Sequence, residues 1–133
     1  MRFLLDDKLI LSGQSLDAVK DMFNEYEFKE TVPEYGDEII FHGKVKLRSI
    51  DCETVIHMYF SRDTYELQSM IIHPFPINFD KVQSYLEKQF GKAASTIKNT
   101  MAEWIIENGK MIHKIEDRWG EEEVVYIDFC LKD

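Results

Sequence analysis

Two stretches of alternating polar and hydrophobic residues dominate the pattern of the chain, one at 53–60 and the other at 122–129. Both follow the motif Glu-x-Val-(Ile/Val)-x-(Met/Ile)-x-Phe. Successive side chains of a β-strand point to opposite faces of its sheet, so each stretch predicts a central strand with one strongly hydrophobic face. The residues of that face are Ile56, Met58 and Phe60 in the first stretch and Val125, Ile127 and Phe129 in the second.

Helical spacing of hydrophobic residues occurs at two places in the chain. The first helix begins at Ser15, whose hydroxyl can accept a hydrogen bond from an otherwise unpaired amide, and it fades at 27–29. The second helix begins at Asn78 and ends before Gly91, a typical C-cap residue. The hydrophobic faces consist of Leu16, Val19, Phe23 and Tyr26 in the first helix and Phe79, Val82, Leu86 and Phe90 in the second.

Short hydrophobic runs between turn residues predict the other strands. Asp6-Asp7 joins a hairpin, His42-Gly43-Lys44 forms a turn, and 92–100 is a polar loop. The strands are expected at 3–5, 8–11, 38–41, 45–50, 54–61, 65–73, 102–107, 111–116 and 123–131.

The order of these elements repeats, since 8–61 and 65–131 each read β-α-β-β-β. The insertions between the two copies fall in turns, as a duplicated chain permits. Helices and strands of this kind also recur in unrelated domains, so convergence is the alternative. The sequence predicts an α+β fold in a single domain, 1–133, with a mostly antiparallel sheet and both helices on one face.

The composition narrows the range of partners. The chain of 133 residues has a net charge of −9, which argues against binding to nucleic acids or anionic membranes, because both need basic patches. An acidic surface promotes solubility and also attracts a basic partner. Cys52 and Cys130 form neither a disulfide framework nor a metal-binding spacing, and no long apolar run is present. We therefore expect a reduced cytoplasmic protein.

No motif for catalysis or for a cofactor is present. The histidines lack metal-binding spacing, the serines lie in no nucleophile elbow, and the glycines form no phosphate-binding loop. The acidic run Glu121-Glu122-Glu123 indicates a solvated hairpin end, because alternate side chains of a strand diverge and do not converge on a metal. We expect no catalytic residues, no metal and no cofactor.

The polar face of the two dominant strands is the main candidate for function, because it is less polar than a solvated face needs to be. Patches of this kind commonly mark binding or dimerisation surfaces. Alternatively, the loop at 92–100 or the N-terminal hairpin covers this face. Its residues are Val55, His57, Tyr59, Val124, Tyr126 and Asp128.

Trp119 is a second candidate, because it lies between charged and glycine neighbours at a predicted hairpin tip. Aromatic residues at exposed tips often anchor contacts with a partner. The alternative is that Trp119 folds back onto the end of the sheet.

Three segments resemble a pattern in small bacterial proteins, namely a helix ending in Phe-Gly, a Trp-bearing strand and further strands. The segments are 85–91 (Tyr-Leu-Glu-Lys-Gln-Phe-Gly), 102–106 (Ala-Glu-Trp-Ile-Ile) and 124–127 (Val-Val-Tyr-Ile). The tandem arrangement is similar to the architecture of beta-lactamase-inhibitor proteins, which implies two helix-plus-sheet units in one chain. Secreted members of that family use disulfides, and this chain has no such framework. A shared fold does not transfer a function.

These observations favour a non-enzymatic protein that binds another protein through His57, Tyr59, Tyr126 and Asp128. An immunity-type inhibitor of a basic toxin is one form that fits the small size and the acidity, and a homodimer is another use of the same face. The alternative hypothesis is a small-molecule-binding or enzymatic domain in which His57 acts beside Tyr59 and Tyr126.

Overall fold

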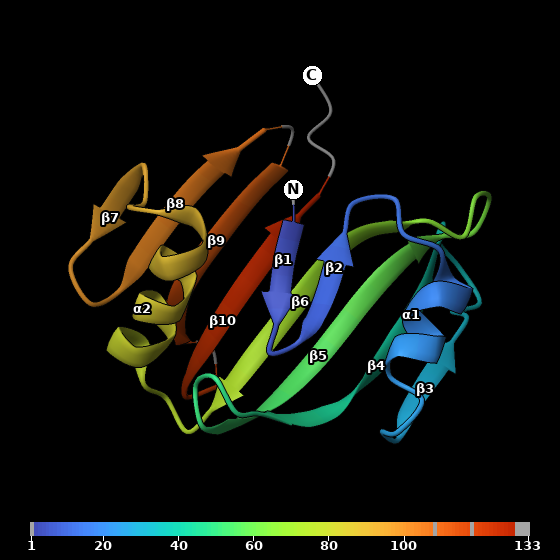
Figure 1. The fold of residues 1–133 in the computed structure, drawn as a ribbon, viewed down its shortest axis with the longest axis horizontal. Coiled ribbons are helices and arrows are strands. Elements are labelled where there is room, and N and C mark those ends of the chain that lie inside the picture. Colours follow the sequence, from blue (N-terminus) through green and yellow to red (C-terminus); the bar gives the residue numbers. More distant parts are fainter. Residues whose placement is uncertain (1, 108, 118, 130–133) are drawn as a thin grey trace.

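The computed structural model describes residues 2–107, 109–117 and 119–129. In these ranges the chain forms an α+β fold with two helices, a separate two-stranded hairpin and one eight-stranded sheet (Figure 1). Neighbouring strands run antiparallel in every described pair. The coarse fold class predicted from the sequence is therefore confirmed.

The first half of the chain forms one side of the sheet and the second half forms the other, and the two halves meet at the centre. Its order is β3 (Phe28–Thr31), β4 (Glu38–Leu47), β5 (Cys52–Ser61), β6 (Leu67–Phe75), β10 (Glu121–Asp128), β9 (Gly109–Asp117), β8 (Met101–Ile106) and β7 (Ser95–Ile97). The hairpin consists of β1 (Arg2–Leu5) and β2 (Lys8–Leu11), and the helices are α1 (Leu16–Met22) and α2 (Phe79–Phe90).

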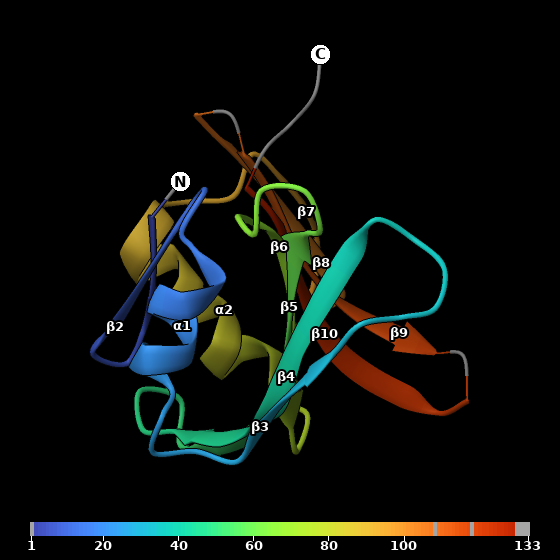
Figure 2. The same cartoon turned by 90° about the vertical axis from the view of Figure 1, so that its right-hand side faces the viewer.

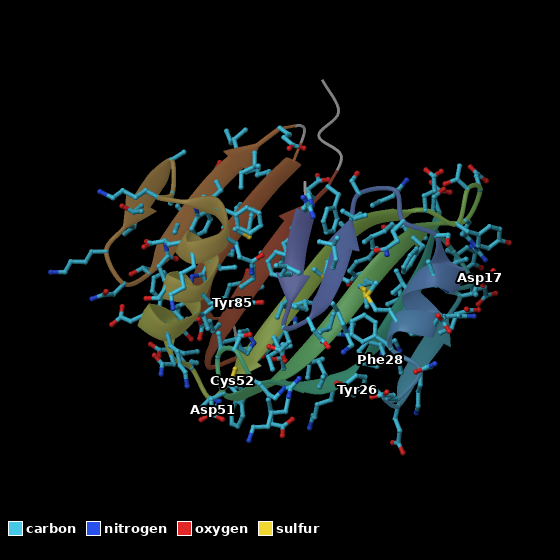
Figure 3. The ribbon with its side chains drawn as sticks, viewed as in Figure 1. Asp17, Tyr26, Phe28, Asp51, Cys52 and Tyr85 are labelled. Atoms are coloured by element: carbon cyan, nitrogen blue, oxygen red, sulfur yellow. The ribbon has the colours of Figure 1, made fainter. Side chains whose placement is uncertain are left out.

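Both helices lie on the same face of the sheet (Figure 2). Directly opposed residues of neighbouring strands share a face of the sheet. One such row runs from β4 to β9 and consists of Phe41, Met58, Met70, Ile127 and Met111. At one end of this row lies Phe28 (Figure 3). It packs on Phe41 and is stacked on Phe23, which follows α1. At the other end, α2 stacks Phe79 on His113, two residues after Met111 on the same face.

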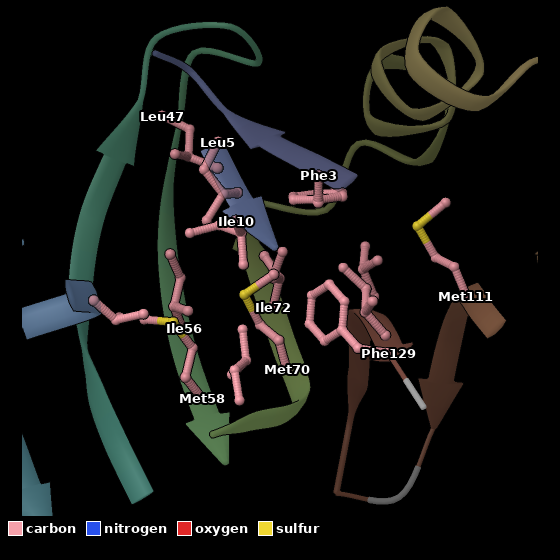
Figure 4. Close-up of a cluster of buried hydrophobic side chains, with 14 of the residues drawn as sticks. Phe3, Leu5, Ile10, Leu47, Ile56, Met58, Met70, Ile72, Met111 and Phe129 are labelled. Atoms are coloured by element: carbon pink, nitrogen blue, oxygen red, sulfur yellow. The ribbon is translucent and has the colours of Figure 1, made fainter. Parts of the chain in front are cut away.

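The N-terminal hairpin packs between the two helices on the same side of the sheet. Phe3, Leu5 and Ile10 are buried above the central strands (Figure 4), and the ring of Phe3 stacks on Phe90 at the end of α2. The turn is held by Asp6, whose carboxylate accepts hydrogen bonds from the backbone N–H groups of Arg48 and Ser49, each at 2.9 Å. The hairpin therefore does not cover the opposite face.

The predicted helix starts are confirmed by their caps. The Ser15 hydroxyl accepts a bond from the Ala18 amide at 3.2 Å, and the Asn78 side chain accepts one from Lys81 at 3.3 Å. The helix α1 ends at Met22, earlier than predicted, because the chain turns into strand β3 at 28.

The predicted turn at His42-Gly43-Lys44 is wrong, since β4 continues unbroken through these residues. A Cβ atom at Gly43 would lie 2.3 Å from Cδ1 of Phe28, the directly opposed residue on β3. Gly43 therefore makes room for an aromatic ring within a strand. The predicted loop at 92–100 also needs correction, because it contains β7, which extends the edge of the sheet beside β8.

The two dominant stretches occupy equivalent positions on either side of β6. Ile56 and Val125 both oppose Ile72, and Met58 and Ile127 both oppose Met70. Their similar patterns match a common environment beneath the helices and the hairpin.

This arrangement does not show the predicted duplication. A meander follows each helix, β3–β4–β5 after α1 and β8–β9–β10 after α2 and β7, and the two meanders lie on opposite sides of β6. Strands β5 and β10 are both antiparallel to β6, so they are parallel to each other. A rotation that superposes the meanders therefore carries one helix to the other face. The duplication of 8–61 as 65–131 stays a prediction that this arrangement does not show.

We expect Phe60→Ala and Phe129→Ala each to lower the free energy of unfolding by about 3–5 kcal/mol, because each substitution leaves a cavity in a close-packed core. Both side chains are buried beneath the helices and the hairpin. Urea denaturation measures the effect, and Phe75→Ala is the control, because Phe75 is 70% exposed and should change stability by no more than about 0.5 kcal/mol. Losses below about 1 kcal/mol at both buried sites would contradict this assignment of faces.

Candidate binding face and pocket

The sheet face opposite the helices and the hairpin is called the open face here. No described helix or hairpin packs on it (Figure 2), and its side chains on the central strands are mostly half-buried. Its central residues are Ile40 and His42 on β4, Val55, His57 and Tyr59 on β5, Ser69, Ile71 and His73 on β6, and Val124, Tyr126 and Asp128 on β10.

Four of the predicted site residues lie in two adjacent rows of the open face. His57 and Tyr126 both oppose Ile71 of β6, so they flank its side chain from either side. Tyr59 and Asp128 flank Ser69 in the same way, one row further along the strands. Partners across one intervening strand are about 9–10 Å apart. The structure thus brings these four residues onto one continuous patch, while Val124 is fully buried and adds no contact surface.

The phenol of Tyr126 is held in place by its neighbours. Its hydroxyl donates a hydrogen bond to Glu116 Oε1 at 2.8 Å, and the Lys114 ammonium lies 5.2 Å from the ring centroid. Lys114 and Glu116 form an ion pair at 3.0 Å. These contacts restrict the ring before any partner binds, which reduces the conformational entropy lost on binding.

Three histidines gather on the open face, and the sequence alone did not predict this cluster. His42 and His57 are directly opposed and their rings stack at 5.6 Å, while the rings of His57 and His73 meet edge to face at 5.9 Å. Nε2 of His42, the outer ring of the three, lies 3.2 Å from the hydroxyl oxygen of Thr31. The strand register brings the three rings together, and the spacing of histidines in the sequence does not reveal that register.

Burial lowers the pKa of His57, and the neighbouring His73 and His42 lower it further because the protonated rings would repel one another. Burial also raises the pKa of the Tyr59 phenol, with a smaller contribution from the carboxylate of Glu38. Both shifts favour the neutral forms of His57 and Tyr59. No group of three or more His, Cys, Asp or Glu residues in the described ranges is arranged to hold a metal ion.

A pocket of about 920 Å³ lies where β5 begins, β6 ends and β10 begins. It extends onto the open face through Lys44, Val55 and His73. From the sequence alone, only a solvated hairpin end is expected at this place. The other lining residues are Glu53, Thr54, Pro74, Phe75, Ile77, Glu121, Glu122 and Glu123.

A buried polar cluster lies beneath this pocket. The ring of His113 places Nε2 at 2.5 Å from Glu123 Oε2 and Nδ1 at 2.8 Å from Gln83 Oε1. The second oxygen of Glu123 accepts the backbone N–H of Asn78 at 2.8 Å, and Phe79 stacks on the imidazole at 4.0 Å. Both ring nitrogens of His113 therefore have a hydrogen-bond partner inside the core. The cluster ties the start of α2 to β9 and β10.

Trp119 projects into solvent. Its side chain is 99% exposed in the turn between β9 and β10, so it does not fold back onto the sheet. It does not line the pocket of about 920 Å³. Of the two cysteines, Cys52 is buried, and burial raises the pKa of its thiol. Cys130 lies outside the described residues.

Comparison with family models, with curated proteins and with solved structures finds no match to this chain. The similarity to beta-lactamase-inhibitor proteins therefore stays a prediction. None of the helices in the described ranges has the length and apolar character needed to cross a membrane.

We expect Glu123→Ala to lower the free energy of unfolding by about 3–5 kcal/mol, because it leaves the buried His113 ring and the Asn78 amide without their acceptor. Urea denaturation of Glu122→Ala provides the control, since this neighbouring side chain is exposed and its loss should change stability by no more than about 0.5 kcal/mol. Equal effects of the two substitutions would show that the buried cluster contributes nothing.

We also expect acid to destabilise the protein partly through His57. Its pKa in the folded state lies below the ordinary value of 6.5, so the unfolded chain takes up a proton first as the pH falls through that value. Denaturation at about pH 7.5 and about pH 5.5 should therefore show a smaller loss of stability in His57→Gln than in the wild type. Parallel pH profiles of the two proteins would contradict the cause assigned to this shift.

Proposed function

We propose that this chain is a non-enzymatic protein-binding module that meets its partner through the open face. The observation that carries the proposal is the one-sided packing of the sheet. Two helices and a hairpin bury one face, and the other presents half-buried His57, Tyr59, Ile71 and Tyr126 without a covering element among the described residues. An unpartnered face with aromatic and aliphatic side chains is typical of a binding surface.

The chemistry of this patch favours a protein partner. Tyrosines offer a large apolar ring with a polar tip, and their two side-chain torsions cost little entropy on binding. Tyr126 is already restricted by Glu116 and Lys114, so it is prepared for contact. The net charge of −9 would speed association with a basic partner and would make the association sensitive to salt. An immunity-type inhibitor of a basic toxin is one form of such a module.

A second candidate function is the binding or conversion of a small molecule. The pocket of about 920 Å³ favours it, because pockets of about 300–1,000 Å³ commonly hold small ligands. His73 contributes to this pocket, and His57 contacts His73. Turnover of a small molecule that is abolished by His57→Ala would establish this alternative and overturn the non-enzymatic proposal.

We expect Tyr59→Ala with Tyr126→Ala to weaken binding of the partner by more than about 2 kcal/mol, a typical cost at a binding hot spot. Capture from an extract of the source organism with the immobilised chain, followed by mass spectrometry, supplies the partner. Titration calorimetry with the purified partner then measures the affinity of each variant.

A matched control is available, because Tyr35 and Tyr65 are exposed and lie outside the open face. Tyr35→Ala with Tyr65→Ala should leave the affinity unchanged, and circular dichroism should show a native spectrum for both double variants. Unchanged affinity in the Tyr59 and Tyr126 variant would exclude the open face and would direct attention to Trp119. If the captured partner is a second copy of the chain, sedimentation should show dimers that the same variant dissociates.

A further inference from the structure

We propose that the pocket at the ends of β5, β6 and β10 anchors an arginine side chain of a basic protein partner. This inference rests on the proposed function and specifies the chemistry of the partner. It combines the charge of the pocket, the nature of its walls and its continuity with the open face.

The charged side chains that line the pocket are mostly acidic. Glu53, Glu121 and Glu122 are exposed, and none of them forms an ion pair with a described residue. Lys44 is the one lysine or arginine in the described lining. Three carboxylates around one hollow repel one another, and a bound cation relieves that repulsion.

The walls of the pocket are apolar, which favours an arginine over a bare ammonium ion. Phe75 is 70% exposed and Ile77 is 40% exposed, and Val55 completes this side of the hollow. A guanidinium stacks on an aromatic face and binds a carboxylate through two parallel hydrogen bonds, whereas an ammonium is strongly hydrated and lacks this planar geometry. An arginine side chain fits both the apolar wall and the acidic rim.

The continuity with the open face favours a segment of protein over a free small cation. Val55 and His73, which line the pocket, are directly opposed on β5 and β6, and the ring of His73 contacts His57 at the centre of the open face. A chain lying across Tyr59 and His57 therefore meets the mouth of the pocket. The volume of about 920 Å³ also exceeds what one side chain fills, which leaves room for the partner's backbone.

Beneath the pocket, the cluster of His113 and Glu123 holds the start of β10 in place. Glu123 is 1% exposed and its oxygens are engaged by His113 and by the Asn78 amide. It therefore keeps β10 registered beside α2, while the adjacent Glu121 and Glu122 remain exposed for the ligand.

The test is a titration of the full chain, labelled with nitrogen-15, with a blocked five-residue peptide, Gly-Arg-Gly-Arg-Gly. The same peptide with citrulline in place of arginine is the neutral control. We expect amide shifts at Val55, His73, Phe75 and Ile77 with the arginine peptide alone. Glu53→Gln with Glu122→Gln should weaken binding by about tenfold, since hydrogen bonds between charged groups are the strong ones.

Glu25→Gln with Glu27→Gln is the matched control, because both residues are exposed, lie beyond α1 and remove the same charge. It should change the affinity by less than about twofold, since it alters only screened, distant charges. Equal weakening by the two double variants would show attraction to net charge alone and would overturn the proposal. Absence of shifts in the pocket would overturn it as well.

A titration with free arginine amide distinguishes an arginine side chain of a protein partner from a free small cation as the ligand of the pocket. The amide should bind several-fold more weakly than the peptide. Equal or tighter binding would reassign the pocket to a small cation. If the arginine peptide does not bind in the pocket but the Tyr59 and Tyr126 variant still binds the partner more weakly, this inference is wrong and the proposed function stands.

Discussion

The alternation of buried and half-exposed side chains along β5, β6 and β10 is the constraint on which the structure depends. Ile56, Met58, Met70, Ile72 and Ile127 all point to one face of the sheet, and the helices and the hairpin gather on that face to exclude water from them. A slip of one residue in any of these strands would expose its hydrophobic row. The one-sided core therefore fixes the register, and the register in turn places His42, His57, His73, Tyr59 and Tyr126 on the side that remains open.

The buried pair of His113 and Glu123 shows how polar groups are accommodated within this core. Desolvating two ionisable side chains is costly unless their polar atoms find hydrogen-bond partners. Besides contacting each other, the His113 ring has Gln83 as a partner and the Glu123 carboxylate has the Asn78 amide. Because the partners come from α2, β9 and β10, the cluster defines how the second helix sits over the sheet. The same cluster forms the floor below Glu121 and Glu122, so the packing of the core and the proposed binding site share one set of contacts.

Much of the fold could be predicted from local signals, and the site only in part. Alternation identified the faces of β5 and β10, and Ser15 and Asn78 marked the helix starts correctly, because these signals are short in range. Gly43 was misread as a turn residue, since only the tertiary position of Phe28 reveals that the missing Cβ makes room for a ring. His57, Tyr59, Tyr126 and Asp128 were predicted together, whereas His42 and His73 were missed, because their proximity depends on a strand register that a single sequence does not fix. The pocket combines the ends of three strands far apart in sequence, which no local pattern displays.

If one face of the sheet is closed by packing and the other is open, the four histidines should differ in accessibility to a reagent. Brief treatment of the native protein with diethyl pyrocarbonate, followed by peptide mass spectrometry, reports the accessibility of each ring. We expect modification of His42, His57 and His73, which are partly exposed on the open face. We expect protection of His113, which is fully buried between Phe79, Gln83 and Glu123. Modification of His113 at a rate equal to that of the other three, or protection of all four in the monomeric protein, would contradict these expectations.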